Sequence, residues 1–483
     1  MPSTETPQFR DLGLLTPVAV GHDGSVGDDR IAANLVTAEH ALVRAWEAVG
    51  EAPAGTADAV VQAAPELDLA AVVAASVSGG NPVIPLVGML KAGLPAESRA
   101  WVHRGATSQD ILDTALVLTS RDAGREVLGQ LEALSRALGA FLEAHRDDVV
   151  AARTLTQHAV PTTVGLRTAN WWRGVARAQA KLADAVAQLP AQLGGAGGTL
   201  AAMVERTDAR VAARLPAEFA AALGLAPSVP WHTQRWPLTE LGDALAQVID
   251  AVALIANQVA TLSRTEIGEL AEGAGGGSSA MPQKRNPAKS VLIRSAAIRA
   301  PHLAATLHSA AAMFVDERPD GAWHAEWPAL RELLRLALGA TANAAELVDG
   351  LKFDADAAAR NLAATHGLIV SERLNAVVRD RVGAARLAEI VGEAVDGGDL
   401  GSLLRAEPAL AGVDVDALLD PAQYTGLADE LAVVPGPGDP AHPAGAAPAA
   451  AAHPAGEPDP AHSAADAPAV APHPIDSPHQ EAK

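Results

Sequence analysis

Apolar residues recur three to four positions apart along most of the chain, with polar residues between them. This spacing is typical of helices with one buried face. It continues for several turns over residues 30–49, 130–145, 171–188, 239–263 and 329–351. Few stretches alternate between apolar and polar residues as strands do. The pattern predicts an all-α protein whose long helices have wide apolar faces that need partners.

Clusters of Gly and Pro interrupt the helical pattern and divide the chain. They lie at 50–54, 79–85, 193–199, 226–231 and 273–287. We expect three helical domains: residues 1–105, a central long-helix bundle with a catalytic loop at 106–350, and residues 351–431. Residues 432–483 are rich in Pro, Ala and His and cannot bury enough apolar surface to offset their ordering entropy. That tail is predicted to be disordered.

Composition narrows the class of protein further. Hydrophobic residues make up 49% of the chain but aromatic residues only 3%, and the dominance of Ala and Leu favours helix over strand. A net charge of -21 without a basic patch argues against nucleic-acid binding. The absence of Cys excludes disulfides and thiolate chemistry. Residues 241–262 carry polar side chains too often for a lipid-facing span, and residues 1–10 lack a signal-peptide pattern. We therefore expect a cytoplasmic protein without membrane contact.

The strongest chemical signal is the segment 273–287, Gly-Ala-Gly-Gly-Gly-Ser-Ser-Ala-Met-Pro-Gln-Lys-Arg-Asn-Pro. Its small residues predict a flexible loop, in which Ser278 and Ser279 supply hydroxyls and Lys284 a positive charge. Asn286, followed by Pro, is predicted to cap a helix. Hydroxyls, a cation and a helix N-terminus at one spot suit a carboxylate ligand. A plain Gly-Ser linker would explain only the small residues.

Two further segments concentrate polar residues. Residues 103–110 read His-Arg-Gly-Ala-Thr-Ser-Gln-Asp, which predicts a donor-rich loop entering a helix with Thr107 or Ser108 as its N-cap. Residues 153–161 read Arg-Thr-Leu-Thr-Gln-His-Ala-Val-Pro. Taken alone, a His such as His158 in the segment 153–161 is more often structural than catalytic.

The loop resembles the signature of the fumarase/aspartase superfamily, Gly-Ser-Ser-x-Met-Pro-x-Lys-x-Asn-Pro, at every fixed position. The resemblance implies that Ser278 handles the carbon-bound proton as the catalytic base. It implies substrate contacts from the rest of the loop, namely Ser279, Met281, Lys284 and Asn286. The other residues that it assigns to substrate binding are Thr107, Ser108, Gln109, Thr154, Gln157, Arg235 and Arg318.

The segment 153–161 departs from the superfamily pattern. Related lyases carry Thr-His-x-Gln here, and that His helps to protonate the leaving group. In this chain Leu155 replaces it, Gln157 is kept and His158 follows. An amine or hydroxide leaving group needs a proton from an acid. A carboxylate, whose pKa is around 4, does not. The departure favours carboxylate addition to an alkene, with His158 as a catalytic or carboxylate-orienting residue.

Several strings resemble bacterial 3-carboxy-cis,cis-muconate cycloisomerases, over about residues 10–430. They lie at 80–86, 103–110, 154–161, 231–235 and 321–327. This resemblance implies a homotetramer with active sites shared between subunits. The small tricarboxylate substrate would close to 4-carboxymuconolactone, a step of protocatechuate breakdown, without a cofactor. No metal is expected, because the chain has neither a His-Glu-x-x-His motif nor a calcium loop.

Three other interpretations stay open. An adenylosuccinate lyase of the same superfamily shares Ser-Ser-Ala-Met-Pro and Thr-Ser-Gln-Asp, but would need the acid His at position 155. A non-catalytic structural protein on this fold is the second. The third is a metal-binding tail, although a solvated low-complexity tail explains its histidines more simply. The Gly-rich run 194–198 follows a helical stretch, so a dinucleotide site is not predicted there.

Overall fold

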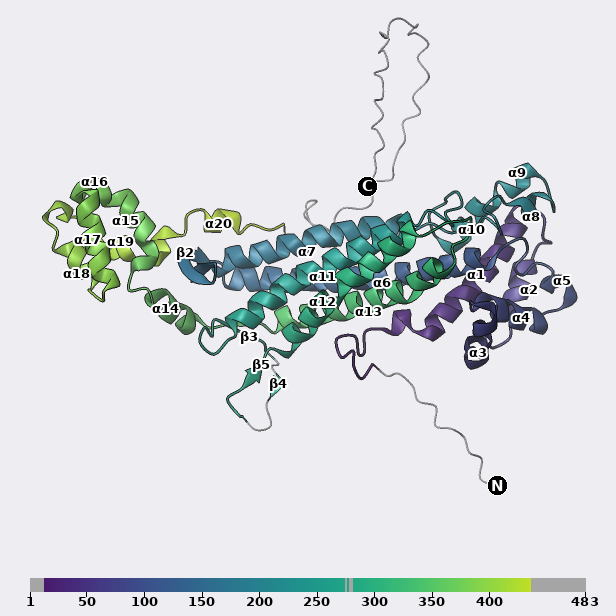
Figure 1. Ribbon diagram of the computed structural model, residues 1–483, viewed down its shortest axis with the longest axis horizontal. Helices are drawn as coiled ribbons and strands as arrows, with labels where there is room; N and C mark the ends of the chain where they lie inside the picture. Colours follow the sequence, from purple (N-terminus) through teal and green to yellow (C-terminus); the bar gives the residue numbers. More distant parts are fainter. Residues whose placement is uncertain (1–12, 274–275, 278–280, 436–483) are drawn as a thin grey trace, which may run out of the picture. The chain divides into compact units, whose positions relative to one another are not determined.

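The computed structural model describes residues 13–273, 276–277 and 281–435, all of which belong to one compact unit. Five long helices lie side by side (Figure 1). They are α6 (Ser108–Ala144), α7 (Val164–Ala187), α11 (Trp236–Leu262), α12 (Ala288–Ala312) and α13 (Gly321–Asp349). The predicted all-α fold with a central bundle of long helices is thereby confirmed.

Helix α6 begins far upstream of the predicted residue 130. Every residue from Gln109 to Ser120 is buried, because α6 packs against α1, α7 and α13. A helix covered on all sides carries no apolar stripe of period 3.6. The sequence pattern therefore revealed only the C-terminal half of α6, where one face meets solvent.

Helix α11 is long and apolar enough to cross a membrane by length and composition alone. Half of its most apolar stretch is buried inside the chain, against α7, α12 and α13. These contacts explain the apolar composition of α11 as that of a core helix in the bundle.

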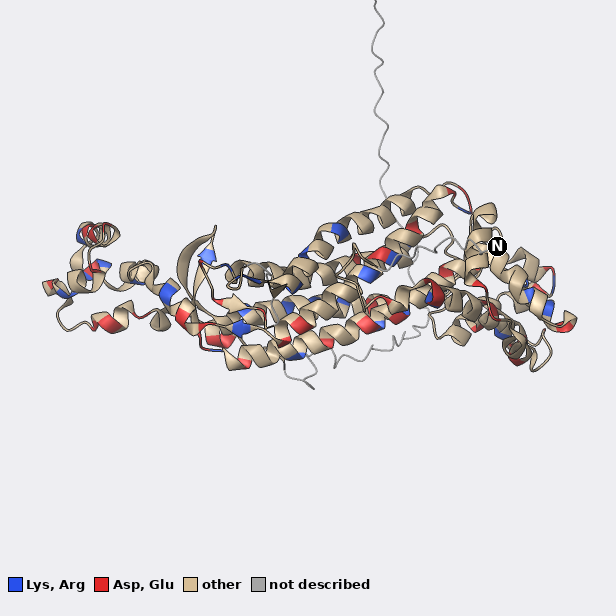
Figure 2. Ribbon diagram, turned by 90° about the horizontal axis from the view of Figure 1, so that it is seen from below, with Lys and Arg blue, Asp and Glu red and all other residues tan. Residues whose placement is uncertain are grey.

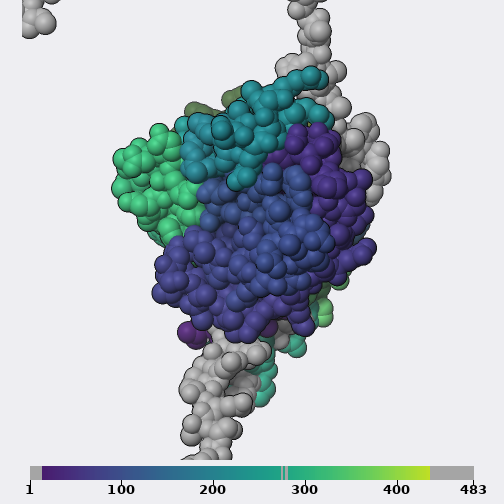
Figure 3. All heavy atoms as spheres, turned by 90° about the vertical axis from the view of Figure 1, so that its right-hand side faces the viewer, coloured from purple at the N-terminus to yellow at the C-terminus, as the bar shows by residue number. Residues whose placement is uncertain are grey.

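Shorter helices surround one end of the bundle, which Figure 3 shows in purple, blue and teal. They are η1 (Gly24–Val26), α1 (Asp28–Ala48), α2 (Thr56–Ala63), α3 (Leu69–Gly79), α4 (Val83–Gly93), α5 (Ala96–Arg99), α8 (Ala201–Val204), α9 (Ala209–Ala212) and α10 (Leu215–Leu223). Helix α1 lies within one turn of its predicted range and buries Trp46 completely. It contacts both α6 and α10, so the N-terminal helices share the core of the bundle.

The C-terminal part consists of short helices, most of which surround a separate apolar cluster that includes Leu374, Ile390 and Leu404. They are α14 (Ala355–Ala363), η2 (Leu368–Val370), α15 (Ser371–Val377), α16 (Arg379–Val382), α17 (Ala384–Val395), α18 (Leu400–Arg405), η3 (Pro408–Leu410), α19 (Val415–Leu419), η4 (Pro421–Tyr424) and α20 (Ala428–Leu431). The domain boundaries given above stay predictions. Of the predicted tail, residues 436–483 and their histidines lie outside the described residues.

Three small antiparallel pairs of strands complete the described chain. They are β1 (Val149–Thr154) with β2 (Gln157–Thr163), β3 (Leu270–Ala271) with β6 (Lys352–Phe353), and β4 (Gly276–Gly277) with β5 (Arg285–Asn286). Acidic and basic residues are interspersed along the long helices (Figure 2). The ion pair of Arg335 with Glu332, 2.8 Å apart, is one example.

Candidate active site

Helix α6 begins within the predicted polar segment 103–110, and Thr107 is its N-cap. The hydroxyl of Thr107 accepts a hydrogen bond from the guanidinium of Arg318, which comes from the connection between α12 and α13. Arg318 also lines an open pocket of about 720 Å³ beside Asp316 and Glu317. Ser108 follows at the first position of α6 and is half-buried. The structure therefore brings together Thr107, Ser108, Arg318 and the N-terminal amides of α6.

Asp110 fixes the loop around this helix start, and the sequence interpretation had not assigned it a role. Its Oδ2 accepts hydrogen bonds from the backbone N–H groups of Thr107 and Gly195, both at 2.9 Å. Its Oδ1 accepts one from Gly194 N–H and lies 2.8 Å from His232 Nε2. A Cβ on Gly194 would lie 2.8 Å from the His232 ring, and Gly195 has φ +74°. The Gly-rich run thus holds the α6 N-terminus rather than a nucleotide.

The structure argues against the predicted substrate contact of Arg235. Its side chain is fully buried and forms ion pairs with Asp113 at 2.7 Å and Glu326 at 2.8 Å. Its guanidinium also stacks on Trp231, 4.8 Å from the ring centroid. Burial alone would lower the pKa of Arg235, but the two carboxylates outweigh it and raise the pKa. With its donors engaged, Arg235 has none to offer a ligand and serves as a core residue.

The same reasoning corrects the prediction for Gln109. Its side chain is fully buried, and its Nε2 donates to Asp113 Oδ2 at 3.2 Å and to the carbonyl of His232 at 3.0 Å.

The spacing of charged residues in two segments carried a signal that the sequence interpretation missed. Asp110 and Asp113 are three residues apart on α6, and their partners His232 and Arg235 are also three apart.

The predicted polar segment 153–161 lies in a hairpin of β1 and β2 with a two-residue turn. Thr154 pairs with Gln157, both exposed, and the turn residues Leu155 and Thr156 have φ of 48° and 71°. Two positive φ values are typical of a type I′ turn, which favours Asn and Gly. Left-handed backbone costs about 1–3 kcal/mol for each such residue and persists only where other contacts fix it. Leu155 is 95% exposed at this tip.

An ion pair with a buried carboxylate lies beside the turn of the hairpin. Arg153 donates to both oxygens of Glu269, at 2.6 and 3.1 Å, and Glu269 is fully buried. Burial would raise the pKa of Glu269, but hydrogen bonds from Arg153 and Asn361 outweigh it and lower the pKa. His158 is the register partner of Arg153. Burial, aided by the charge of Arg153, lowers the pKa of His158 from its ordinary value, which favours the neutral ring.

The stem of the signature loop is formed by β4 and β5, in which Gly276 pairs with Asn286 and Gly277 with Arg285. Lys284 and Met281 are exposed, and the backbone N–H of Lys284 donates to the carbonyl of Met281 at 3.0 Å. Ser278 and Ser279 lie outside the described residues. Lys284 and Asn286 line a pocket of about 430 Å³.

The predicted helix cap at Asn286 is wrong. Helix α12 starts at Ala288, and Asn286 belongs to β5 instead. Glu272 takes the place of a cap: its carboxylate accepts hydrogen bonds from the backbone N–H groups of Lys289 at 3.1 Å and Ser290 at 2.9 Å. The carboxylate that satisfies this helix N-terminus therefore belongs to the chain itself. A long-range acid can replace a local cap, because the N–H groups need only an acceptor.

The three predicted segments do not meet within one chain. Helix α6 has 37 residues and is therefore about 55 Å long. Thr107 lies at its N-terminal end, whereas the hairpin follows its C-terminal end. Glu269 ties the hairpin to the start of the signature loop, so these two segments lie at the same end. One chain thus presents two half-sites, far apart.

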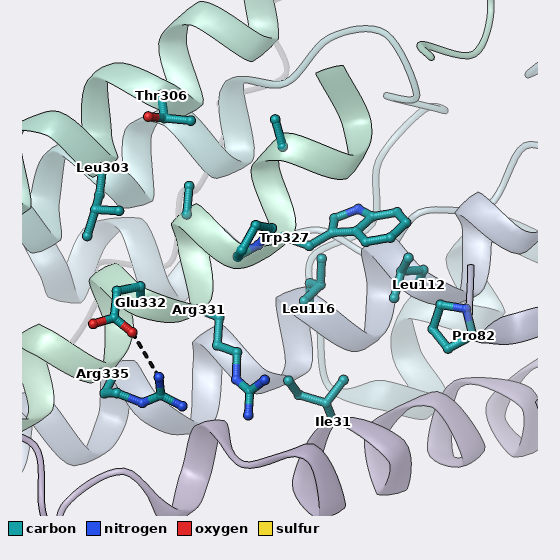
Figure 4. A pocket seen from close by; sticks show the side chains of 13 residues that line it. Ile31, Pro82, Leu112, Leu116, Leu303, Thr306, Trp327, Arg331, Glu332 and Arg335 are labelled. Carbon is teal, nitrogen blue, oxygen red and sulfur yellow. Dashed lines mark hydrogen bonds and ion pairs between the residues drawn. The ribbon is translucent and has the colours of Figure 1, made fainter. Parts of the chain in front are cut away.

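The remaining pockets differ in chemistry. A pocket of about 660 Å³ between α6, α12 and α13 has Leu112, Leu116, Leu303 and Trp327 in its wall (Figure 4). Its charged residues are engaged in ion pairs, Glu332 with Arg335 and Arg331 with Asp28. This apolar lining does not suit a small carboxylate. Within residues 13–273, 276–277 and 281–435, no three His, Asp or Glu side chains gather in a way that could hold a metal ion.

The chain is similar to known proteins in both sequence and structure. A family model described as lyase matches residues 23–301. Nitrosuccinate lyase of Streptomyces davaonensis is 45% identical over 452 residues, covering 89% of this chain and 95% of that protein. A 3-carboxy-cis,cis-muconate cycloisomerase of Pseudomonas aeruginosa is 40% identical over 409 residues, covering 81% and 88%. The crystal structure of the 3-carboxy-cis,cis-muconate lactonizing enzyme from Pseudomonas putida superposes with a TM-score of 0.78 at 34% identity, covering 84% and 93%.

Proposed function

The chain belongs to the fumarase/aspartase superfamily of lyases, and on that premise we propose that it adds or removes a weakly basic anion at a carbon–carbon double bond. The bond to the anion forms or breaks at the carbon β to a substrate carboxylate. A proton is added or removed at the α carbon between them. Enzymes of this family act on small carboxylate substrates.

Leu155 is the observation that carries the proposal. It stands at the tip of the β1–β2 hairpin, where related lyases have the His that protonates the leaving group, and its side chain cannot transfer a proton. Burial lowers the pKa of His158, which disfavours the charged ring that a replacement acid would need. A site without an acid suits a leaving group that is stable as an anion.

The other roles follow from charge and position. Ser278 handles the proton at the α carbon, and Lys284, which is exposed on the same loop, stabilises the negative charge that develops on the conjugated carboxylate. Arg318, Thr107 and Ser108 bind a second carboxylate at the N-terminus of α6. No step in this scheme uses Arg235, whose donors are engaged in the core, or Gln109, whose side chain is fully buried.

A complete site needs more than one chain. The two half-sites lie at opposite ends of α6, and no small substrate spans about 55 Å. Large apolar side chains on the long helices are exposed in the single chain, among them Leu254, Val291 and Ile298. Both observations support a homotetramer in which the α6 end of one subunit meets the loop and hairpin of others.

Two substrates fit this chemistry. The first is 3-carboxy-cis,cis-muconate, whose own carboxylate adds to a double bond and closes a lactone. The second is nitrosuccinate, from which nitrite leaves with the electrons of the C–N bond while the base takes the neighbouring proton, forming fumarate. The higher identity and coverage of nitrosuccinate lyase favour the second. The several cycloisomerases at 32–40% identity favour the first.

Parallel assays of the purified enzyme decide between them. Loss of the diene absorbance of 3-carboxy-cis,cis-muconate identifies a cycloisomerase. Release of nitrite together with fumarate identifies a nitrosuccinate lyase. Turnover of adenylosuccinate, whose amine leaving group needs an acid, would contradict the role given to Leu155. A folded enzyme inactive on all three substrates would contradict the proposed function.

His158→Gln is expected to raise KM more than it lowers kcat, because a neutral ring binds the substrate rather than transferring its proton. The lowered pKa of His158 favours its neutral ring at neutral pH, so any change in wild-type kcat/KM that His158 causes should appear on the acid side and be absent from the variant. Steady-state kinetics across pH measure both effects. His308→Gln, at an exposed histidine paired with Asp243, is the control. A fall in kcat at unchanged KM would instead indicate proton transfer by His158.

A further inference from the structure

Glu269 joins three parts of the chain through one buried carboxylate. Its Oε1 accepts hydrogen bonds from Arg153 on β1 at 2.6 Å and from Asn361 on α14 at 2.8 Å. Its Oε2 accepts a second bond from Arg153 at 3.1 Å and lies 3.7 Å from Arg167 on α7. Two cations and an amide therefore share this carboxylate, and the side chains of Arg153 and Arg167 are each only 15% exposed.

The hairpin depends on this carboxylate for its position. Arg153 stands two residues before the strained turn at Leu155 and Thr156, and its Cα pairs with that of His158. Paired residues of an antiparallel ladder project from the same face. A strained turn keeps its shape only where other contacts fix it. Within the described part of the chain, the two-pronged bond from Arg153 to Glu269 is the charged contact that fixes this end of β1.

Glu269 is also fixed to the start of the signature loop. It immediately precedes β3, and its backbone carbonyl accepts a hydrogen bond from the N–H of Asp354 at 3.0 Å. Three residues later, Glu272 holds the N-terminus of α12. A shift of the Glu269 side chain would therefore change the distance between the hairpin and the stem that carries Lys284.

We infer that Glu269 is a positioning residue, which through Arg153 sets the His158 hairpin relative to the stem of the signature loop. It touches no reacting atom in this scheme. The kinetic consequence rests on the proposed function, whereas the effect on the hairpin does not.

Glu269→Gln tests the inference, because it removes the charge and keeps the size of the side chain. We expect kcat to fall about 10- to 100-fold, since small displacements in a site have effects of this order. KM should rise as well, because the displaced hairpin carries His158, but less than in His158→Gln, because Thr107, Ser108 and Arg318 keep their geometry. Without substrate, backbone amides of residues 149–163 should exchange with deuterium faster than in the wild type, whereas those of α11 and α13 should not.

Two further variants make the test specific. Glu346→Gln makes the same chemical change at an exposed ion pair with Lys289 and should leave both readouts unchanged. Arg153→Lys keeps the charge but loses the two-pronged bond, so it should reproduce the effect more weakly. If Glu269→Gln does not fold, Arg153→Lys still tests the contact between Arg153 and Glu269.

Unchanged kcat and unchanged exchange in residues 149–163 would overturn the inference. Faster exchange throughout the bundle would also overturn it, because Glu269 would then support stability in general. If the wild type turns over none of the proposed substrates, the proposed function fails, while the exchange experiment still decides the role of Glu269.

Discussion

Ser278→Ala is expected to lower kcat by about 10²- to 10⁴-fold, the contribution of a positioned proton-transfer group. Ser278 follows β4, whose Gly277 pairs with Arg285, so the stem holds both ends of the segment that carries Ser278 and Lys284. KM should change little, because the substrate carboxylates are bound by other residues. Steady-state kinetics with the substrate identified above measure the effect. Ser295→Ala, at an exposed serine of α12, is the matched control and should retain full activity.

Hybrid enzymes extend this test to the shared site. Arg318→Met removes the guanidinium at the α6 end without touching the core, and we expect it to be inactive as well. Random mixing of Ser278→Ala and Arg318→Met chains should restore about a quarter of the sites, if each site takes these residues from different subunits of a symmetric assembly. Mixed assemblies without any recovery would show that both residues serve the same site from one chain. Near-normal turnover by Ser278→Ala alone would exclude its role as the base.

Arg235→Met is expected to destabilise the fold by about 3–5 kcal/mol, because it leaves the carboxylates of Asp113 and Glu326 buried without a cation. Chemical denaturation measures this loss. Arg299→Met breaks a partly exposed ion pair with Glu332 and should cost only about 0.2–1 kcal/mol.

The kinetics of Arg235→Met distinguish the two roles considered for this residue. The fraction that remains folded should keep a KM close to that of the wild type. A large rise in KM with unchanged stability would restore Arg235 to the substrate-binding residues that the sequence suggested.

The sequence determined the features that depend on neighbours along the chain. Apolar spacing was sufficient for α1 and α11, because each of these helices has one face that meets solvent or a less buried layer, whereas α13 begins eight residues before its predicted start. The signature loop was recognisable from the sequence because its polar residues stand at fixed spacings within fifteen consecutive residues. The replacement at Leu155 was visible for the same reason, and it still carries the proposed function.

Tertiary structure decided which polar groups remain free for a ligand. Arg235 and Asp113 are 122 residues apart, and Glu272 reaches the start of α12 across 17 residues, so neither pairing is encoded in a local pattern. Burial then makes such pairings obligatory, because an unpaired charge in the core costs several kcal/mol. The sequence by itself therefore determined the fold class and the chemistry expected of the loop. Only the folded chain separated the charged residues that hold the core from those that can meet a substrate.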